Sequence, residues 1–362
     1  MAGTFEGHPG SDLATPTTTG ARGPGSCYRV MPFDSRYLRD ILRIECALWS
    51  PDTKINAAYF DWKYLQNPYL ADPHLYLVLH ADEVVGVRGF HGSAWRVGPD
   101  PAVVVSPAGG DTVVAPLHQG RGLFAKLNRY AVDHLTQEGF RFLCNFSAAR
   151  VTYLRSIRSG WRSVGPYDLL VRDRVAGRPS GRDVPDSKVS VSDRPRPDAM
   201  AALARECDSP NLIRLHRDRA FFDWRYRSPL SRYCFLYTGG ERLDGFMILQ
   251  KRLFLEKPGM RIVDWQCRDP RTFSLLLEAA IARIDTERLS IWSATLPRDI
   301  CVRLKRAGFQ PAGNAAGAGG QYPGPLVLML GGAADQPHWR LGESSLTELP
   351  AWELRMICSD GC

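Results

Sequence analysis

The most informative part of this chain is residues 112–127, which read Thr112-Val113-Val114-Ala115-Pro116-Leu117-His118-Gln119-Gly120-Arg121-Gly122-Leu123-Phe124-Ala125-Lys126-Leu127. Thr112 to Ala115 has the composition of a strand, and from Leu123 apolar residues recur at the spacing of one helix face. Between them, Gln119 to Gly122 forms a loop with two glycines. Loop N–H groups and a helix N-terminus attract negative charge, and glycine lets a ligand approach the backbone. This pattern predicts an anion site on a strand–loop–helix unit.

An internal repeat sets the organisation of the chain. Tyr59-Phe60-Asp61-Trp62-Lys63-Tyr64 reappears later as Phe221-Phe222-Asp223-Trp224-Arg225-Tyr226. In each copy a predicted β-hairpin follows this motif. Each copy then ends with a short amphipathic helix, a glycine and an aromatic residue, Gly160-Trp161 and Gly308-Phe309. Three matches in the same order indicate two copies of one α/β unit.

Composition suggests where the units begin and end. The stretch from Arg172 to Pro197 is rich in Arg, Asp, Ser, Gly and Pro, as linkers are. We therefore expect a disordered tail (1–26), a first domain (27–172), a linker (173–190), a second domain (191–332) and a C-terminal tail (333–362). Trp339 and Trp352 are candidates for anchoring that C-terminal tail.

The overall composition is that of a globular protein. Hydrophobic residues make up 44% of the 362 residues and charged residues 23%, which excludes disorder of the whole chain. No apolar run is long enough for a transmembrane helix, and the start lacks the apolar core of a signal peptide, so we expect no membrane and a cytoplasmic location. The nine cysteines are scattered, without a CxxC pair, so we expect neither a disulfide framework nor a metal.

The charge balance is basic, with 46 basic against 38 acidic residues and a net charge of +8. Only seven of the basic residues are lysine. A basic surface attracts phosphates, in a nucleotide cofactor or in a polynucleotide. Because the charges are dispersed and form no basic tract, nucleic acid is the less favoured partner.

The loop resembles the pyrophosphate-binding signature of the GNAT (N-acetyltransferase) superfamily, V-x-P-x-x-[QR]-x-x-G-x-[GA]. Val114, Pro116, Gln119 and Gly122 match in register, whereas Phe124 stands where the family usually has Gly or Ala. The resemblance implies a mixed α/β fold of the α+β type, with two tandem GNAT-like domains. It also implies an acyl-CoA co-substrate, with acetyl-CoA as the first candidate. It implies cofactor contacts from Val113, Val114, Ala115, Gln119, Gly120, Arg121, Gly122, Leu123 and Phe124.

The rest of the first copy also resembles the family. Residues 142–146 are similar to the strand that splays from its neighbour to admit the pantetheine arm. Asn145 is expected to bind that arm or the acceptor, or to cap the following helix. Gly160-Trp161 resembles the family's YxxxGF motif, with Ser156 at the position of the usual acid tyrosine and Tyr153 one turn away. The resemblance is strong over residues 27–172 and weaker over residues 191–332.

The second copy departs from this pattern where the loop should be. Its equivalent stretch, Ile262 to Phe273, contains no glycine and no QxxGxG. We interpret the second copy as a degenerate GNAT fold that no longer binds a cofactor, and that supports the first copy and covers its acceptor side.

Two residues are candidates for a general base. Asp111 enters the strand just before the loop, and its carboxylate is either a base for the incoming ammonium or a turn aspartate after Gly109-Gly110. The second copy, which lacks the loop, has an aspartate at the equivalent position, Asp264. This repetition favours a structural role for Asp111. His91, near the end of a predicted strand, is the other candidate base, although a lone histidine is more often structural. The repeated Asp-Trp-Lys/Arg-Tyr motif is interpreted as packing, with an acceptor wall as the alternative.

The resemblance implies an acyl-CoA-dependent N-acyltransferase whose first copy is active. A primary amine of a small molecule attacks the thioester directly, and backbone N–H groups near Val113 and Val114 hold the oxyanion. Tyr153 or Ser156 is expected to protonate the departing thiolate. One alternative is a GNAT-like transferase that takes an aminoacyl or acyl group from tRNA or a carrier protein. The other is a non-catalytic binding module that retains the fold.

Overall fold

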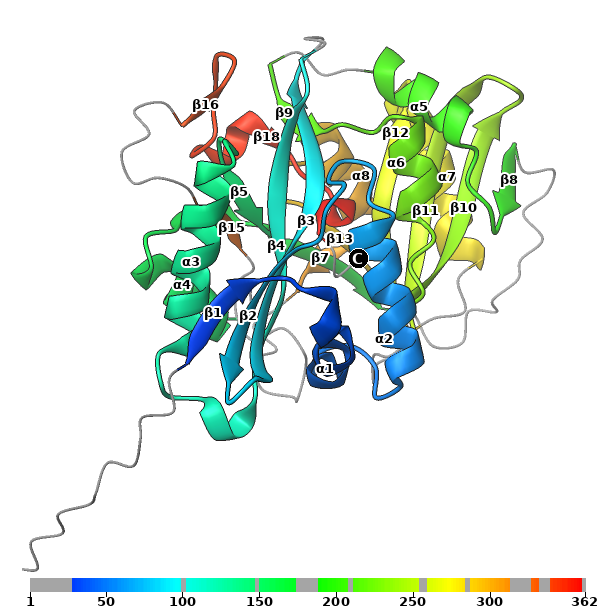
Figure 1. Cartoon of the computed structure of the whole chain (residues 1–362). Helices are drawn as coiled ribbons and strands as arrows, with labels where there is room; N and C mark the ends of the chain where they lie inside the picture. Colours follow the sequence, from blue (N-terminus) through cyan, green and yellow to red (C-terminus); the bar gives the residue numbers. More distant parts are fainter. Residues whose placement is uncertain are drawn as a thin grey trace, which may run out of the picture.

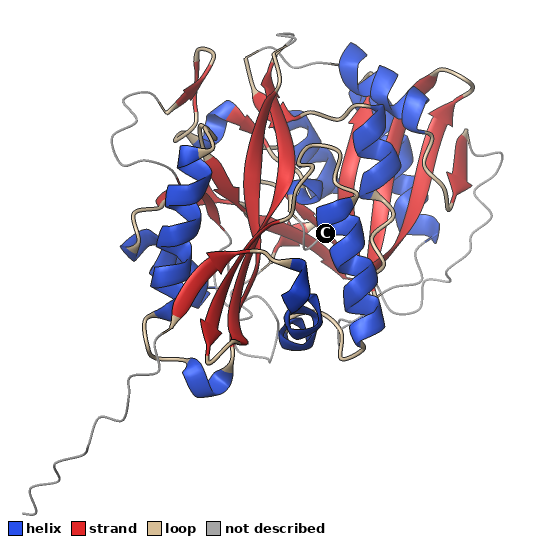
Figure 2. Cartoon of the chain, in the orientation of Figure 1, coloured by secondary structure: helices blue, strands red, loops and turns tan. Residues whose placement is uncertain are grey.

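The computed structural model describes residues 28–98, 102–146, 150–173, 188–207, 211–253, 259–283, 287–312, 327–331 and 339–359. The expected disordered tail at 1–26 and most of the expected linker at 173–190 lie outside these ranges. Figure 1 shows the chain coloured from its N-terminus to its C-terminus, and Figure 2 shows its helices and strands.

The first half contains a strand, two helices, a three-stranded meander, a helix, a strand, a helix and two final strands. In order these are β1 (Arg29–Pro32), α1 (Leu38–Ile44), α2 (Thr53–Phe60), β2 (His74–His80), β3 (Glu83–Val97), β4 (Val104–Val114), α3 (Leu123–Gln137), β5 (Leu143–Asn145), α4 (Arg150–Arg158), β6 (Arg162–Pro166) and β7 (Leu169–Asp173). A short π-helical turn, Asp61–Leu65, extends α2. The apolar faces of α1 and α2 pack on one side of β2 and β3, and that of α3 packs on the other.

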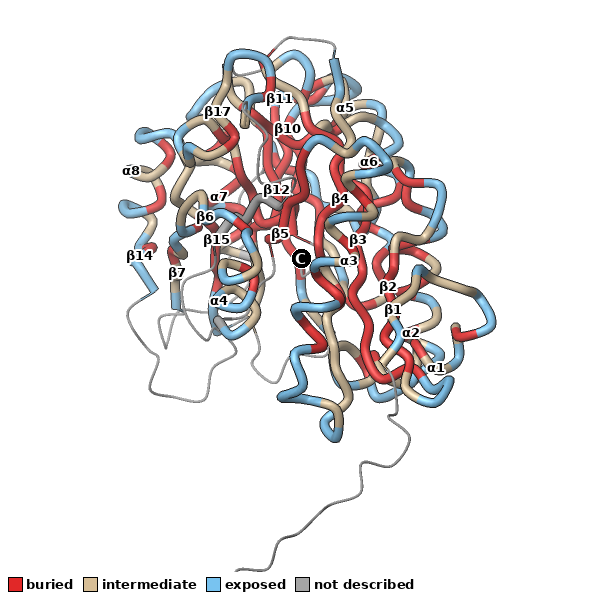
Figure 3. Tube along the Cα trace, turned by 60° about the vertical axis from the view of Figure 1, so that its left-hand side comes forward, coloured by how far each residue is buried: buried red, intermediate tan, exposed pale blue. Residues whose placement is uncertain are grey.

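The second half repeats this order. Its elements are β8 (Val189–Ser192), α5 (Pro197–Glu206), β9 (Ile213–Leu215), α6 (Arg219–Arg225), β10 (Ser231–Gly239), β11 (Leu243–Arg252), β12 (Met260–Cys267), α7 (Pro270–Arg283), β13 (Arg288–Trp292), α8 (Arg298–Arg306), β14 (Gln310–Pro311) and β15 (Val327–Gly331). The C-terminal residues add the short strands β16 (Arg340–Leu341), β17 (Ser344–Ser345) and β18 (Trp352–Glu353). The central strands of both sheets are buried, whereas the edge strand β14 is exposed and α3 and α4 keep exposed outer faces (Figure 3).

The two halves exchange their last strands. The first sheet runs β1-β2-β3-β4-β5-β15-β6, and the second runs β14-β7-β13-β12-β11-β10-β8. Thus β7 pairs antiparallel with β13, and β15 lies between β5 and β6. The sheets do not follow the expected domain bounds, because β7 lies at the end of the expected first domain (27–172) but completes the second sheet. The ring of Tyr167, just before β7, stacks on Trp292 of β13 with centroids 4.1 Å apart.

The repeated motif meets itself at the contact between the halves. Trp62 Nε1 donates to the carbonyl of Trp224 over 2.9 Å, and Trp224 Nε1 donates to the carbonyl of Trp62 over 2.7 Å. The two indole rings stack with centroids 5.2 Å apart and an interplanar angle of 12°. Both side chains are buried. These reciprocal contacts relate the halves by an approximate two-fold axis and support the packing interpretation of the motif.

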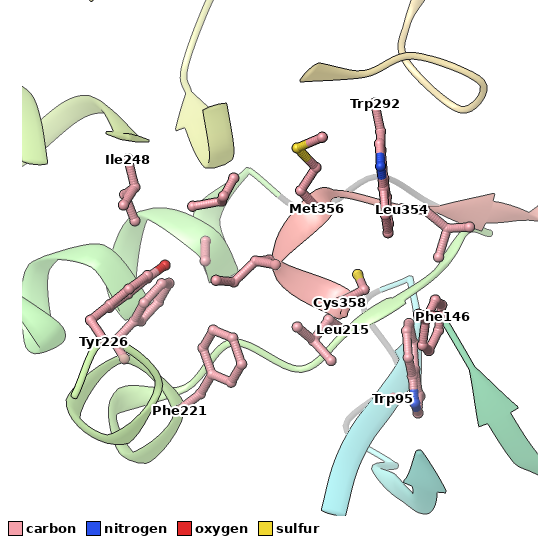
Figure 4. Packing of buried hydrophobic residues seen from close by; sticks show 14 of the residues in the cluster. Trp95, Phe146, Leu215, Phe221, Tyr226, Ile248, Trp292, Leu354, Met356 and Cys358 are labelled. Carbon is pink, nitrogen blue, oxygen red and sulfur yellow. The ribbon is translucent and has the colours of Figure 1, made fainter. Parts of the chain in front are cut away.

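The C-terminal residues belong to the core. Strand β18 pairs with β9, which in turn pairs with β3, so the end of the chain joins the first sheet. Trp352 is buried and packs edge-on against Trp95, with ring centroids 5.1 Å apart. Leu354, Met356 and Cys358 enter the largest apolar cluster, between residues of both halves (Figure 4). Trp352 thus anchors this segment, as the sequence suggests, and Trp339 packs against the same cluster.

Membrane-crossing helices are absent from the described residues, since none of their helices has the necessary length and apolar character.

Candidate active site

The first sheet opens next to the predicted loop. Strands β4 and β5 pair in parallel at Ala108↔Cys144 and Gly109↔Asn145, where β5 ends. Strand β4 continues to Val114 paired with β3 on its other side, whereas its pairing with β5 ends at Gly109. This is the opening that the sequence analysis expects at residues 142–146. Asn145 is buried at the point where the strands separate.

The loop between β4 and α3 has the backbone shape that its glycines permit. Gly120 and Gly122 have φ values of +77° and +72°, in the left-handed region that other residues adopt at a cost. A Cβ built at either glycine meets no atom within 4 Å, so this side of the loop is open. Gln119 Nε2 donates to the carbonyl of Val114 over 2.9 Å and closes the loop.

The start of α3 presents free N–H groups beside this loop. The first helical bond runs from the N–H of Lys126 to the carbonyl of Gly122 over 3.1 Å, so the N–H groups of the first turn have no acceptor within the helix. Arg121 is exposed on the loop, whereas Leu123 and Phe124 are buried. The bulk of Phe124 therefore points into the protein and does not fill the open side of the loop. Ala115 is held to β3 by its N–H, which donates to the carbonyl of Val85 over 2.9 Å.

Strand β4 bulges at the point where the sheet opens. Arg88 pairs with Thr112 but Phe90 pairs with Gly109, so β4 has one extra residue at Gly110-Asp111. Such a bulge redirects backbone N–H groups out of the regular ladder. The register shift therefore places irregular backbone directly before Val113 and Val114.

Asp111 is fixed on one face of this bulge by three donors. Its Oδ1 accepts from Lys63 Nζ over 2.9 Å and from Trp49 Nε1 over 2.8 Å, and its Oδ2 accepts from the Tyr64 hydroxyl. Asp111 and Lys63 are 1% and 0% exposed. A proton taken up directly by Asp111 would break this buried ion pair, so the contacts favour a structural role and leave the predicted role as base untested.

A second carboxyl group lies in the same buried cluster. Burial raises the pKa of Glu45 well above its ordinary value, and the neighbouring Asp111 carboxylate raises it further, while Lys63 acts in the opposite direction. Burial, followed by the charge of Asp111, also raises the pKa of Tyr64. The cluster therefore favours one ion pair, Lys63 with Asp111, surrounded by neutral groups.

Arg88 fixes the other face of the bulge, and sequence reasoning did not find it. The side chain is buried, and its Nη1 donates to the carbonyl of Gly110 over 3.2 Å and to the Thr112 hydroxyl. Its guanidinium lies 4.7 Å from the centroid of the Phe90 ring. A Cβ at Gly109 would come within 2.5 Å of Arg88 Nη2, which explains the glycine at that position. A single arginine within an apolar strand is the signal that could have identified it.

The remaining predicted residues lie on β3, β4 and α4. His91, opposite Ala108 in the β3–β4 register, is 8% exposed. Ser156 of α4 is fully buried, and its hydroxyl makes no hydrogen bond with any described residue. Tyr153, one turn earlier, is half-buried and packs against the α3 core. Val113 packs toward α1 and α2, and Val114 packs toward α3.

These features fit an acyl-CoA co-substrate at the β4–α3 junction. The open glycine loop and the first turn of α3 offer N–H groups for a pyrophosphate, and the parted strands offer backbone groups to an extended arm. The buried hydroxyl of Ser156 has no hydrogen-bond partner among the described residues. Among the residues that the structure describes, no cluster of His, Cys, Asp or Glu could hold a metal.

The second half has a similar opening, which its C-terminal segment lines in part. A cavity of about 450 Å³ lies there, between the start of α7, the residues after β13 and Glu353–Arg355. Strands β12 and β13 pair only at Met260↔Leu289 and Arg261↔Ser290. Arg355 of the C-terminal segment enters there, donating to Asp264 Oδ1 over 3.0 Å and to the carbonyl of Trp265.

Neighbouring contacts hold that segment in place. The N–H of Leu354 donates to Thr295 Oγ1, beyond the end of β13, over 2.9 Å. Asp264, the counterpart of Asp111, is buried and ion-paired with Arg217 as well, over 2.7 Å. At the start of α7 the carboxylate of Asp269 accepts from the N–H groups of Arg271 and Thr272, which puts negative charge where the first half has its open loop.

Known structures resemble this architecture. A GCN5-related N-acetyltransferase from Anabaena variabilis superposes with a TM-score of 0.59 at 12% identity, over 84% of this chain and 72% of that chain. A tandem GNAT protein from the clavulanic acid biosynthesis pathway superposes with a TM-score of 0.53 at 11% identity, over 84% of this chain and 98% of that chain. A probable N-acyltransferase from Enterococcus faecalis gives a TM-score of 0.54 at 10% identity, over 84% and 72% of the two chains. The sequence itself matches no known family and no curated protein.

The chain therefore has the GNAT fold. Its two halves repeat that fold in tandem, as the internal repeat predicts, and the predicted mixed α/β class is confirmed.

Proposed function

We propose that this protein is an acyl-CoA-dependent N-acyltransferase whose first half carries the reaction. The observation that carries the proposal is the opening between β4 and β5, which leads to an open glycine loop at the start of α3. The fold shared with proteins titled acetyltransferases and N-acyltransferases supports the same reaction class. Acetyl-CoA as donor, a primary amine of a small molecule as acceptor, and a cytoplasmic location belong to this proposal.

In the proposed reaction, backbone N–H groups of residues 120–124 and the side chain of Arg121 bind the pyrophosphate. The bound thioester supplies the activated acyl carbonyl. Asn145 and the free edge of β4 orient the arm, and the backbone near Val113 and Val114 donates to the oxyanion. The acceptor amine attacks that carbonyl directly, so no covalent enzyme intermediate is needed.

Proton transfers are assigned to groups around the opening. We propose His91 as the base that removes a proton from the attacking amine, because both carboxylate oxygens of Asp111 are already engaged. Asp111, with Lys63 and Tyr64, then fixes the β4 bulge in place. The hydroxyl of Ser156, or that of Tyr153, protonates the departing thiolate.

Only the first half is proposed to bind the donor. The second half lacks the glycine loop, its helix start carries Asp269, and Arg355 and Leu354 lie in its opening. Isothermal titration with acetyl-CoA should therefore give one site per chain. Two equivalent sites would overturn this part of the proposal.

The test uses a matched pair of arginines at the starts of α3 and α7. Arg121→Glu should weaken acetyl-CoA binding at least about tenfold, because a charge-assisted hydrogen bond of about 1.5–3 kcal/mol becomes a repulsion. Arg271→Glu, an exposed change at the start of the second helix, should leave binding unchanged. Equal effects of the two variants would contradict the assignment of the loop.

Donor assays separate the alternatives. Acetyl-CoA, aminoacyl-tRNA and an acyl carrier protein are each offered with a panel of primary amines, and product is measured by mass spectrometry. Product from the CoA thioester alone supports the proposal. Product only with aminoacyl-tRNA or with the carrier protein would identify that molecule as the donor in place of acetyl-CoA. No turnover with any of the three donors would favour a non-catalytic binding module.

A further inference from the structure

A row of aromatic rings leads from the β4 bulge to the second half. Trp49, between α1 and α2, donates from its Nε1 to Asp111 Oδ1 over 2.8 Å. The centroid of its ring lies 5.0 Å from that of Tyr59, which lies 5.4 Å from that of Trp62. Trp62 in turn stacks on Trp224 of the second half. The surroundings of the proposed reaction centre therefore extend to the contact between the two halves.

The second half contributes an arginine to this row. Arg252, at the end of β11, has its guanidinium carbon 6.0 Å from the centroid of the Trp49 ring. Lys63 Nζ, from the first half, lies 5.5 Å from the same centroid. A cation within about 6 Å of the centroid is attracted by the electrons of the ring. Trp49 therefore contacts one cation from each half, and because Trp49 and Arg252 are only half-buried, a substrate can reach both.

The two cations differ in how their charges are balanced. Lys63 forms a buried ion pair with Asp111 over 2.9 Å. Arg252 forms no ion pair with a carboxylate of the described residues, and its contact is the ring of Trp49. Residues 254–258, which lie outside the described ranges, include one acidic and one basic residue and so add no net charge. The guanidinium of Arg252 is therefore available to an anionic group of a ligand.

We propose that Arg252 binds a carboxylate of the acceptor, so that the acceptor is an amine that also carries a carboxylate group. The planar guanidinium presents paired donors that match the two oxygens of a carboxylate. In this arrangement the amine reaches the thioester at the β4 bulge, and the carboxylate meets Arg252 beside the Trp49 ring. The inference rests on the proposed function. It adds the class of the acceptor and gives the second half a role in specificity.

Matched pairs of amines test this proposal. Lysine and cadaverine, ornithine and putrescine, and β-alanine and ethylamine differ within each pair only by a carboxylate. Isothermal titration of the full chain should show that the member with the carboxylate binds more tightly in at least one pair. The expected preference is about tenfold, which corresponds to about 1.4 kcal/mol. Equal affinity within every pair would overturn the proposal.

Variants at the end of β11 assign the preference to Arg252. Arg252→Gln should abolish it, whereas Arg252→Lys, which keeps the charge but not the planar fork, should retain part of it. Lys251→Gln is the control, because Lys251 is exposed and successive side chains of a strand point to opposite faces of the sheet. Melting temperatures check that each variant is folded. Equal losses in Arg252→Gln and Lys251→Gln would overturn the proposal, since they would reflect net charge and not a contact.

Turnover separates this inference from the proposed function. With acetyl-CoA as donor, Arg252→Gln should raise the Michaelis constant for the preferred amine about tenfold and leave that for its counterpart without the carboxylate unchanged. Acetylation of both members of every pair with equal kcat/KM would overturn the inference but support the proposed function. Preferential binding without acetylation from any donor would overturn the proposed function and support the carboxylate site.

Discussion

At the scale of single residues, the β4 bulge is held between two buried cations. Arg88 fixes the carbonyl of Gly110 from one face, and Lys63 fixes Asp111 from the other. Arg88 is held by the Gly110 carbonyl and the Thr112 hydroxyl, and Lys63 by the Asp111 carboxylate; both are buried, which makes both arrangements sensitive to small changes. The backbone that is proposed to hold the oxyanion is therefore rigid before a substrate arrives.

Asp111→Asn tests whether Asp111 serves to fix the bulge or to accept a proton from the acceptor amine. The variant leaves Lys63 buried without its counter-ion, so we expect a loss of about 3–5 kcal/mol in the free energy of unfolding, measured by urea denaturation. The loss of turnover relative to the wild type should be the same at every pH. Asp264→Asn, the matching change in the second half, should also destabilise the chain but leave acetyl-CoA binding intact. A defect that shrinks at high pH with unchanged stability would instead make Asp111 the base.

Glu45→Gln tests the buried carboxyl group by its pH dependence. The pKa of Glu45 is raised in the folded chain, so the native state holds a proton that the unfolded state has released above about pH 4.3. Stability from this group is present below that pH and is lost as the pH rises through the folded pKa. The melting temperature of the variant should therefore exceed that of the wild type by a margin that grows from pH 4 to pH 9. Glu206→Gln should show the opposite sign, and at lower pH: hydrogen bonds from Arg242 and Arg268 lower the pKa of exposed Glu206, so the advantage of the wild type over this variant should be lost as the pH falls below about 4.3.

Local pattern predicts some of these residues and misses others. The loop residues 119–122 were predicted because glycines and an amphipathic helix follow one another directly in the sequence. Arg88, Glu45 and Trp49 contact the site from separate elements, and single polar residues on a strand or a short helix have no periodic signature. Their role depends on which elements meet, which the sequence pattern does not specify.

At the scale of elements, the strand–loop–helix unit concentrates the proposed donor contacts. Gly122→Ala places a side chain where φ is +72°, so it should cost about 1 kcal/mol in stability and weaken acetyl-CoA binding about tenfold. Binding is measured by calorimetry and stability by thermal unfolding. Gly240→Ala is the control, because its φ lies outside the left-handed region and nothing lies within 4 Å of the added Cβ. Unchanged affinity in Gly122→Ala would place the phosphates elsewhere.

The exchange of β7 and β15 shows what sequence patterns cannot resolve at this scale. Leu169–Asp173 and Val327–Gly331 are both five-residue strands, and either would complete a sheet of its own half. The sequence patterns point only to the helix, glycine and aromatic residue that precede these strands in each copy, and do not place the strands themselves. The partner is decided by the short turn after β6, where the ring of Tyr167 stacks on Trp292 and its carbonyl accepts the N–H of Ala294 over 3.0 Å.

At the scale of the whole molecule, the halves are joined by shared strands, by the C-terminal segment and by the Trp62–Trp224 contact. A pair of domains with a small polar interface would move relative to each other. Here β7, β15 and β9 each pair with a strand of the other half, and the largest apolar cluster contains residues of both. We therefore expect the chain to unfold as one cooperative unit.

A double-mutant cycle on the two tryptophans measures that coupling. Trp62→Ala and Trp224→Ala should each cost about 3–5 kcal/mol, because each removes a large buried ring and one of two reciprocal hydrogen bonds. Each single variant already loses the stacking contact, so the double variant should cost less than the sum by about 0.5–3 kcal/mol. Urea denaturation followed by fluorescence and by circular dichroism should give coincident transitions. Trp62→Ala combined with Phe273→Ala, which lies in the separate α7 core, should be additive. Additive tryptophan variants, or two resolved transitions, would mean that the halves fold independently and that the exchanged strands alone connect them.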